Sequence, residues 1–486
     1  MKSAKLTILI FICTLLTLDT VAFARPAIQI LGASPYGAVS GRVWGKVSGG
    51  ADYSHFRIVV FIKVADAWWV KPYCSRSLTR IQPDGSWQTE ITTGGRDDLA
   101  DYIIAYLVPS APSAGSIACA ANCEPSGIAE SIAFTIYDRR PPKRVLSFAG
   151  YKWLVRKTDL PSRPAGNIFS DDPEDVWVDR AGRLHLTIAR KGDRWESTEV
   201  MRLASLGRGV YMVQTDSRLN LNDCNSVTGA FTWDPWLCDG VHRELDWEIS
   251  KWGKATRSTD AQFVVQPCPE CPGCPGQCVR YEINPADASG YITTYIIWGG
   301  KKVEFRSYRG QFTDHFPSAD FLIKKWAYTN RAGIPTPGKE NFHLNLWLFG
   351  ARPPQDGKRQ EVVFSNFSFS DKAVMIERAS KLRALPGYLR GMVTEGVEPA
   401  KYKIEVYVQV NGKWWSKPAF DRPFTGISSE RTWSAPITTG GDDETAARMA
   451  VFLVPIDKGP HLAAGLDDIP AAVFADSISR DEIIRR

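Results

Sequence analysis

The sequence predicts an all-β protein, and three observations support this expectation. Short segments in which apolar and polar residues alternate recur along most of the chain, and a period of two is typical of strands. Turn-forming clusters such as Pro83–Trp87 (PDGSW) separate these segments. Helical periodicity is nearly absent, and the first and last hundred residues repeat one another. We therefore expect a central β-jelly roll sandwich between two homologous small β-sandwich modules.

The first 24 residues have the pattern of an export signal. A basic start (Lys2, Lys5) precedes an apolar run over residues 6–18, and Ala22-Phe23-Ala24 fits a small-x-small cleavage site. The run is shorter than the ~20 residues that a membrane span needs. We therefore expect a signal peptide over residues 1–24, a secreted or periplasmic chain, and no membrane span.

Residues 27–140 and 387–486 are expected to be two copies of one module. The segment AWWVKP (Ala67–Pro72) matches KWWSKP (Lys413–Pro418), and ITTGG occurs in both copies. Every match has the same offset of 346 residues, and more than twenty positions are identical between Gly45 and Pro109 and their counterparts. Chance does not give such agreement, so the two copies are expected to share one fold.

Each copy contains two adjacent tryptophans, Trp68-Trp69 and Trp414-Trp415. Neighbouring residues on a strand face opposite ways, so one of each pair is expected in the core. The other makes a second packing contact, which we favour, or offers a platform on which a sugar ring stacks. Residues 371–386 are expected to be a linker, with a short helix before Pro386 as one option.

Residues 145–370 are expected to form the jelly roll, and they contain an unusual acidic segment. Glu244, Asp246 and Glu248 alternate with Leu245 and Trp247. Residues i, i+2 and i+4 of a strand share one face, so the three carboxylates are expected to point together. The outer Cα atoms would lie ~13 Å apart, and inward-leaning Glu side chains can reach the ~5–5.5 Å separation of retaining glycosidases.

The alternative is a solvent-exposed strand face that carries three like charges. The surrounding sequence favours an active site, because aromatic walls suit pyranose rings and tryptophans flank the segment on both sides: Trp233, Trp236, Trp252 and Trp298.

The E-L-D-W-E motif, followed by ISKWG (Ile249–Gly253) and NLWLFG (Asn345–Gly350), resembles glycoside hydrolase family 16 over about residues 145–370. The resemblance implies a concanavalin A-like jelly roll and a secreted retaining endo-enzyme that acts on β-glucans or galactans. By position, Glu244 matches the nucleophile, Asp246 the assisting acid and Glu248 the general acid/base. The motif departs from the commoner version at Trp247, where a smaller aliphatic residue is frequent.

We therefore expect a glycosidase that cleaves β-linked polysaccharide by double displacement, without a cofactor or a metal. Two rival functions are a non-catalytic carbohydrate-binding protein and a transglycosylase, and the latter would use the same acids. A formal net charge of +6 over 486 residues argues against nucleic acid as a partner. Five residues are candidates for the sugar-binding cleft: Asn167, Trp195, Glu199, Trp233 and Trp252.

The ten cysteines fit an oxidising destination. Cys224 with Cys238 and Cys119 with Cys123 are the pairs that sequence proximity suggests. A further cluster has spacing that also suits an iron–sulfur cluster or zinc, but the expected export favours a disulfide-stapled loop; its members are Cys268, Cys271, Cys274 and Cys278.

Overall fold

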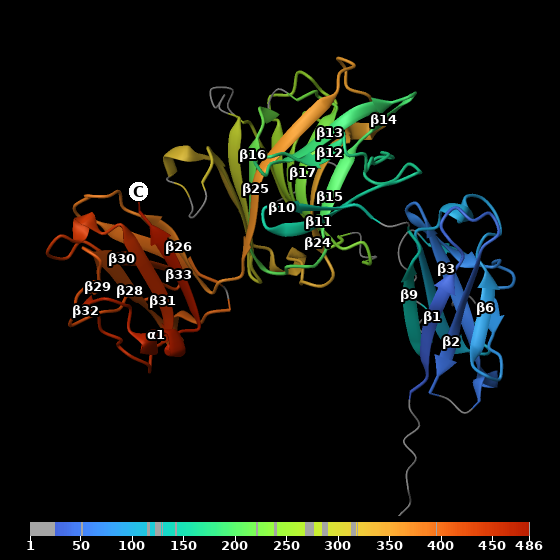
Figure 1. The fold of residues 1–486 in the computed structure, drawn as a ribbon, viewed down its shortest axis with the longest axis horizontal. Coiled ribbons are helices and arrows are strands. Elements are labelled where there is room, and N and C mark those ends of the chain that lie inside the picture. The colour runs from blue at the N-terminus through green and yellow to red at the C-terminus, as the bar shows by residue number, and fades with distance from the viewer. Residues whose placement is uncertain are drawn as a thin grey trace, which may run out of the picture. The chain divides into compact units, whose positions relative to one another are not determined.

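The computed structural model describes residues 25–485 except for 50–51, 114–116, 122–127, 129, 141–142, 220–221, 238–240, 268–276, 284–289, 313–316, 318 and 395. The expected signal peptide, residues 1–24, lies outside the described residues. The chain divides near residue 141 into two compact units, and strands dominate both (Figure 1). The prediction of an all-β fold is confirmed.

The first unit is a sandwich of two antiparallel sheets. The smaller sheet has the order β1-β2-β6, with bounds Ala27–Ala33, Arg42–Ser48 and Ser86–Glu90. The larger sheet has the order β8-β4-β3-β7-β9 with β5 beside β3, and its bounds are Ala120–Ala121, Ala67–Lys71, Phe56–Val64, Tyr102–Pro109, Ala133–Asp138 and, for β5, Leu78–Arg80.

The C-terminal module repeats this topology within the second unit. Its smaller sheet, β26-β27-β30, comprises Val374–Ala379, Tyr388–Val393 and Thr432–Pro436. Its larger sheet has the order β32-β29-β28-β31-β33, with bounds Ala464–Leu466, Lys413–Lys417, Tyr402–Val410, Arg448–Pro455 and Ser479–Ile484. The α-helix of the described residues, α1 (Ala471–Asp476), belongs to the same module.

The prediction that residues 371–386 form a linker is wrong. Residues Val374–Ala379 form β26 of the C-terminal module and pair with β27. This strand corresponds to β1 at the same offset of 346 residues, because Ala27 and Ile30 match Ala373 and Ile376. Its apolar side chains are needed to close the sandwich, so the segment cannot remain a free connection or form a helix.

Both copies keep one buried ion pair that ties a strand end to a turn. In the first copy the Lys71 ammonium pairs with Asp97 and also donates to Thr93 Oγ1 at 3.1 Å. In the second copy Lys417 pairs with Asp443 in the same way. The acceptor carboxylate also receives backbone N–H bonds from the TTGG turn, so the charges are compensated and the turn is fixed.

Both suggested cysteine pairs are wrong. Cys119 forms a disulfide with Cys74, because β8 pairs with β4 and brings Cys119 beside the end of that strand. Cys224 is a buried free thiol. The other cysteine of each suggested pair lies outside the described residues, namely Cys123 and Cys238. The same holds for three members of the cluster: Cys268, Cys271 and Cys274.

The central part of the second unit consists of two eight-stranded antiparallel sheets that span Val145–Ser370. The first sheet has the order β10-β11-β15-β24-β17-β18-β19-β20, with bounds Val145–Phe148, Tyr151–Val155, Thr198–Arg202, Asn341–Leu348, Ser226–Trp233, Leu245–Ile249, Ala261–Val265 and Cys278–Tyr281. The second sheet has the order β12-β13-β25-β16-β21-β22-β23 with β14 beside β13, and its bounds are Val176–Val178, Leu184–Lys191, Gln360–Ser370, Gly209–Asp216, Tyr291–Trp298, Val303–Arg309, Leu322–Tyr328 and, for β14, Arg194–Glu196.

The hydrophobic core lies between these two sheets, as a jelly roll requires. The first sheet contributes Leu245, Trp247 and Phe263, and the second contributes Trp298 and Phe305. All five side chains are buried. Every second residue of β18 therefore faces the core, and the acidic residues between them face the other way. Within the described residues, no helix is long and apolar enough to cross a membrane.

Candidate active site

Three acidic side chains share the outer face of β18, which is an inner strand of the first sheet. Asp246 and Glu248 lie within the strand, and Glu244 directly precedes it. Asp246 is buried, whereas Glu244 and Glu248 are partly exposed. The two glutamates are therefore neither covered completely nor free in solvent, whereas Asp246 between them is covered.

Strand register places a row of polar residues across the sheet at the level of Glu248. Glu248 lies opposite Gly229 of β17 and opposite Gln262 of β19. The row continues from Gly229 to Asn345 of β24, and from there to Glu199 of β15. Side chains from strands far apart in the sequence thus meet on one face, which we call the polar face.

A glycine in the middle of this row keeps the polar face open. A Cβ atom at Gly229 would lie less than 3.0 Å from Asn345 Oδ1, which real contacts avoid. Any side chain at this position would therefore displace the Asn345 amide or project over Glu248. The glycine lets both neighbouring polar groups share the space above β17.

Two glutamines of β19 and its extension hold the acids. Gln262 Nε2 donates to Glu248 Oε2 at 2.5 Å, and Gln266 Nε2 donates to Asp246 Oδ2 at 3.0 Å. The contact between the Glu244 and Asp246 carboxyls acts to raise the pKa of Glu244 and to lower that of Asp246.

The environment raises the pKa of all three acids. Burial is the largest cause for each, and the pKa values of Glu244 and Asp246 lie well above their usual range. The charge of Asp246 and that of Glu248 raise the pKa of Glu244 further. The hydrogen bond from Gln262 acts in the opposite direction on Glu248. Neighbouring carboxyls with raised pKa values can hold and release protons, as acid/base catalysis requires.

Glu199 stays ionised at the other end of the row. Burial raises its pKa, but Arg156 at 3.0 Å and the bonds from His343 and Asn345 outweigh burial and lower the pKa of Glu199 to about 2. Its negative charge contributes to the raised pKa of Glu244. The polar face therefore contains a fixed anion together with carboxyls that hold protons.

Trp233 lies at the end of β17, next to the level of Glu244. Its strand pairs with Asn341 of β24 on the polar face, and its ring stacks on His242 at 4.0 Å between centroids. The side chain is partly exposed. Glu199 and Trp233 are thus the two predicted sugar-binding residues that the fold brings to the acids.

The other three sugar-binding predictions are not supported by their surroundings. Asn167 is buried, and its amide is used within the chain: it donates to two carbonyl oxygens and accepts from Leu348 N and Ser197 Oγ. Trp195 lies on β14, which pairs with the opposite sheet, and packs against the core.

Trp252 is buried, and the Arg280 guanidinium covers its ring at 4.4 Å. The ring supports a chain of contacts, because Arg280 Nε donates to Gln262 Oε1 at 3.2 Å. Gln262 in turn binds Glu248. Trp252 therefore fixes the surroundings of the acids and does not form a stacking surface.

Several residues of the polar face were not predicted from the sequence: Arg156, Gln262, Gln266, Arg280, His343 and Asn345. The sequence did contain one signal for them. Gln262 and Gln266 interrupt the apolar segment AQFVVQP, and polar residues in a strand that is buried on both faces indicate a polar site there. The alternating His343 and Asn345 in NFHLNLWLF gave the same signal.

Neither a protein-family model nor a curated protein matches the chain. Solved structures similar to it include a β-glucanase of Bacillus licheniformis, with 15% identity over 45% of this chain and 92% of that one and a TM-score of 0.33. A laminarinase from Flavobacterium sp. UMI-01 has 12% identity over 45% and 93%, with a TM-score of 0.35. A protein described as a pseudo β-1,3-glucanase of Mycobacterium tuberculosis has 17% identity over 45% and 91%, with a TM-score of 0.33.

Proposed function

We propose that the chain is a secreted retaining endo-glycosidase of the family 16 type that cleaves a β-linked polysaccharide. The observation that carries this proposal is the row of Glu244, Asp246 and Glu248 on one face at β18. The two glutamates are partly exposed, and glutamines donate hydrogen bonds to Asp246 and Glu248. A non-catalytic binding protein gains nothing from three neighbouring carboxyls with raised pKa values, because their repulsion and burial both destabilise the fold.

The proposed reaction is a double displacement. Glu248 donates its proton to the glycosidic oxygen that leaves, while Glu244 attacks the anomeric carbon and forms a glycosyl-enzyme. Glu248 then removes a proton from the water that hydrolyses this intermediate. Asp246, which Gln266 holds by a hydrogen bond, lies between the two glutamates and is proposed to assist Glu244.

Two further residues of the polar face are proposed to help bind the substrate beside the acids. Trp233 is proposed as a stacking surface for a pyranose ring. Glu199 is buried and already bonded to Arg156, His343 and Asn345, so it is proposed to position these neighbours rather than to contact the sugar. The signal sequence over residues 1–24 supports export. The domain limits proposed are 27–140 and 145–370, followed by a C-terminal module that begins with β26.

The test is a reducing-sugar assay on β-glucans and galactans with Glu244→Gln. Deleting the nucleophile is expected to lower kcat by at least ~10³-fold. Glu174→Gln is the matched control, because Glu174 is an exposed glutamate of the same domain. Retained turnover in Glu244→Gln would show that the nucleophile is misassigned. No release of reducing ends from any polysaccharide, but transfer to an added oligosaccharide acceptor, would identify a transglycosylase.

A further inference from the structure

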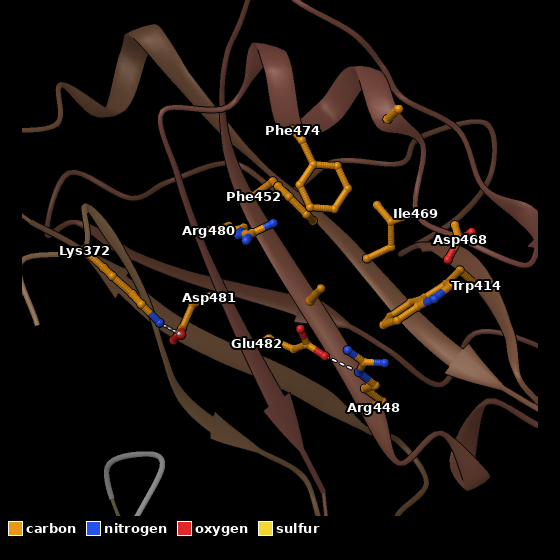
Figure 2. A pocket seen from close by; sticks show the side chains of 12 residues that line it. Lys372, Trp414, Arg448, Phe452, Asp468, Ile469, Phe474, Arg480, Asp481 and Glu482 are labelled. Atoms are coloured by element: carbon orange, nitrogen blue, oxygen red, sulfur yellow. Dashed lines mark hydrogen bonds and ion pairs between the residues drawn. The ribbon is translucent and has the colours of Figure 1, made fainter. Parts of the chain in front are cut away.

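The C-terminal module contains a cavity that the proposed reaction does not use. It has a volume of about 890 Å³ and lies on the outer face of the five-stranded sheet (Figure 2). Strands β29, β31 and β33 supply its floor, and α1 with the segment before it supplies a wall. Figure 2 shows Trp414, Phe474 and Glu482 around one opening. The volume is in the range of small-ligand sites, ~300–1,000 Å³.

Comparison of the two module copies shows that this surface has diverged in the C-terminal copy. Ala450 in the floor corresponds to Ile104 of the first copy, so the second copy has less side-chain volume at that position. Three further lining positions change from apolar or aromatic to charged residues: Tyr102, Phe134 and Ile136 correspond to Arg448, Arg480 and Glu482. The first copy folds without these charges, so the fold itself does not require them.

The charges that line the cavity balance one another. Arg448 pairs with Glu482, and Lys372 pairs with Asp481 at 2.6 Å. Arg480 and Asp468 add one charge of each sign. A cavity with as many carboxylates as cations offers no excess positive charge for phosphate, sulfate or uronate groups. Hydroxyl groups both donate and accept hydrogen bonds, so guanidinium and carboxylate groups together suit them.

Aromatic rings lie beside these polar groups. Trp414 is buried beneath the Arg448 guanidinium at 5.5 Å, and Phe474 is 44% exposed with Arg480 at 5.0 Å from its ring. In the part of the chain that the structure describes, no acceptor pairs with the Trp414 indole N–H. Phe474 thus presents an apolar surface for the C–H face of a sugar ring, next to donors and acceptors for its hydroxyls.

We propose that this cavity binds a neutral oligosaccharide, so that the C-terminal module holds a polysaccharide chain apart from the acids of the central domain. The proposal that the same polysaccharide binds at the cavity and at the acids rests on the proposed function. The evidence from the balanced charge and the exposed aromatic ring does not depend on that function.

The test uses the full chain with Glu244→Gln, which prevents cleavage, and isothermal titration calorimetry. The probes are neutral β-linked gluco-pentasaccharides with 1,3, 1,4 and mixed linkages, and a sulfated galacto-oligosaccharide. Ala450→Ile restores the residue of the first copy and narrows the cavity at its floor, and Phe474→Ala removes the exposed ring. Phe420→Ala is the control, because Phe420 is a 58% exposed phenylalanine of the same module and does not line the cavity.

A neutral probe is expected to occupy two sites in the background protein and the control. Each cavity variant should lose one site or weaken it at least 10-fold. A single site that the cavity variants abolish would support the cavity and contradict sugar binding at the acids. If the number of sites and their affinities were the same in Phe474→Ala as in the background protein, the cavity proposal would be overturned and the proposed function would stand. Binding of the sulfated probe alone, or of no probe, would also overturn it.

Discussion

The three acids of the polar face should destabilise the free protein at neutral pH, and Glu244→Gln should relieve part of this cost. Same-face neighbours on a strand have Cα atoms ~6.6 Å apart. Two full negative charges at that separation repel by about 2.5 kcal/mol at an effective dielectric constant of ~20. Because the hydrogen bond from Gln266 compensates part of the Asp246 charge, the relief is smaller, and we expect about 2 kcal/mol at pH 8, or ~4–8 °C in the Tm of the central domain.

The expected pH dependence follows from the raised pKa of Glu244. A carboxyl whose pKa is higher in the folded state stabilises the fold below its unfolded pKa, and this contribution is lost as the pH rises through the folded pKa. The native protein should therefore lose stability relative to Glu244→Gln from the usual glutamate range upward. At pH 4 the native glutamate is protonated, so the two proteins should unfold at nearly the same temperature.

Differential scanning calorimetry between pH 4 and pH 8 measures this difference directly. Glu174→Gln is the matched control, because this exposed carboxylate lies outside the polar face and its neutralisation should leave the transition within ~0.5 kcal/mol. A Glu244→Gln protein that is no more stable than the native protein at pH 8 would refute the reasoning. It would show that electrostatic repulsion among the ionised acids does not lower the free energy of unfolding.

Three further predictions concern positions around the site and in the C-terminal module. Gly229→Ala should push the Asn345 amide aside and lower kcat/KM on polysaccharide by ~10–100-fold while the far-ultraviolet circular dichroism stays native; an unchanged rate would show that the row need not stay open. Gln262→Met removes the donor that lowers the pKa of the third acid, so the alkaline limb of the kcat/KM profile should move to higher pH, and a shift to lower pH would contradict its role as the acid. Lys417→Met leaves Asp443 buried without its partner and should cost about 3–5 kcal/mol in urea unfolding of the C-terminal module; a loss below ~1 kcal/mol would show that the pair is solvated.

The sequence was sufficient to predict the fold class and the orientation of the acids, because both depend on local alternation. Leu245 and Trp247 are buried, and the acids between them face away from the core. The partners of the acids could not be placed in the same way. Gln262 reaches Glu248 through the register of the consecutive strands β18 and β19, and Asn345 reaches Glu199 through that of β15 and β24, which lie far apart in the chain. Alternation does not fix either register.

The mistaken linker and the mistaken disulfide pairs have different origins. Pairing of Cys74 with Cys119 depends on β8 lying beside β4, a contact over 45 residues. Nearby cysteines in the sequence gave no information about it. The strand Val374–Ala379 was detectable, because the repeat offset continues to Ala373. Extending the comparison of the copies in both directions would have placed it in the module.

The two sheets of the C-terminal module have different surroundings, and comparison with the first copy shows that both surfaces have changed. On the smaller sheet, Met375 and Met392 are buried in a cluster with Tyr295 of the central domain, whereas the first copy has Gln29 and Lys46 at these positions, both exposed. The cavity lies on the other sheet. A module that packs on the central domain through one sheet keeps its opposite sheet accessible, so a polysaccharide held in the cavity does not compete with that packing. Divergence at both surfaces, with the buried ion pair unchanged and the core positions still apolar, is the pattern expected when one duplicated module acquires a fixed attachment and a ligand of its own.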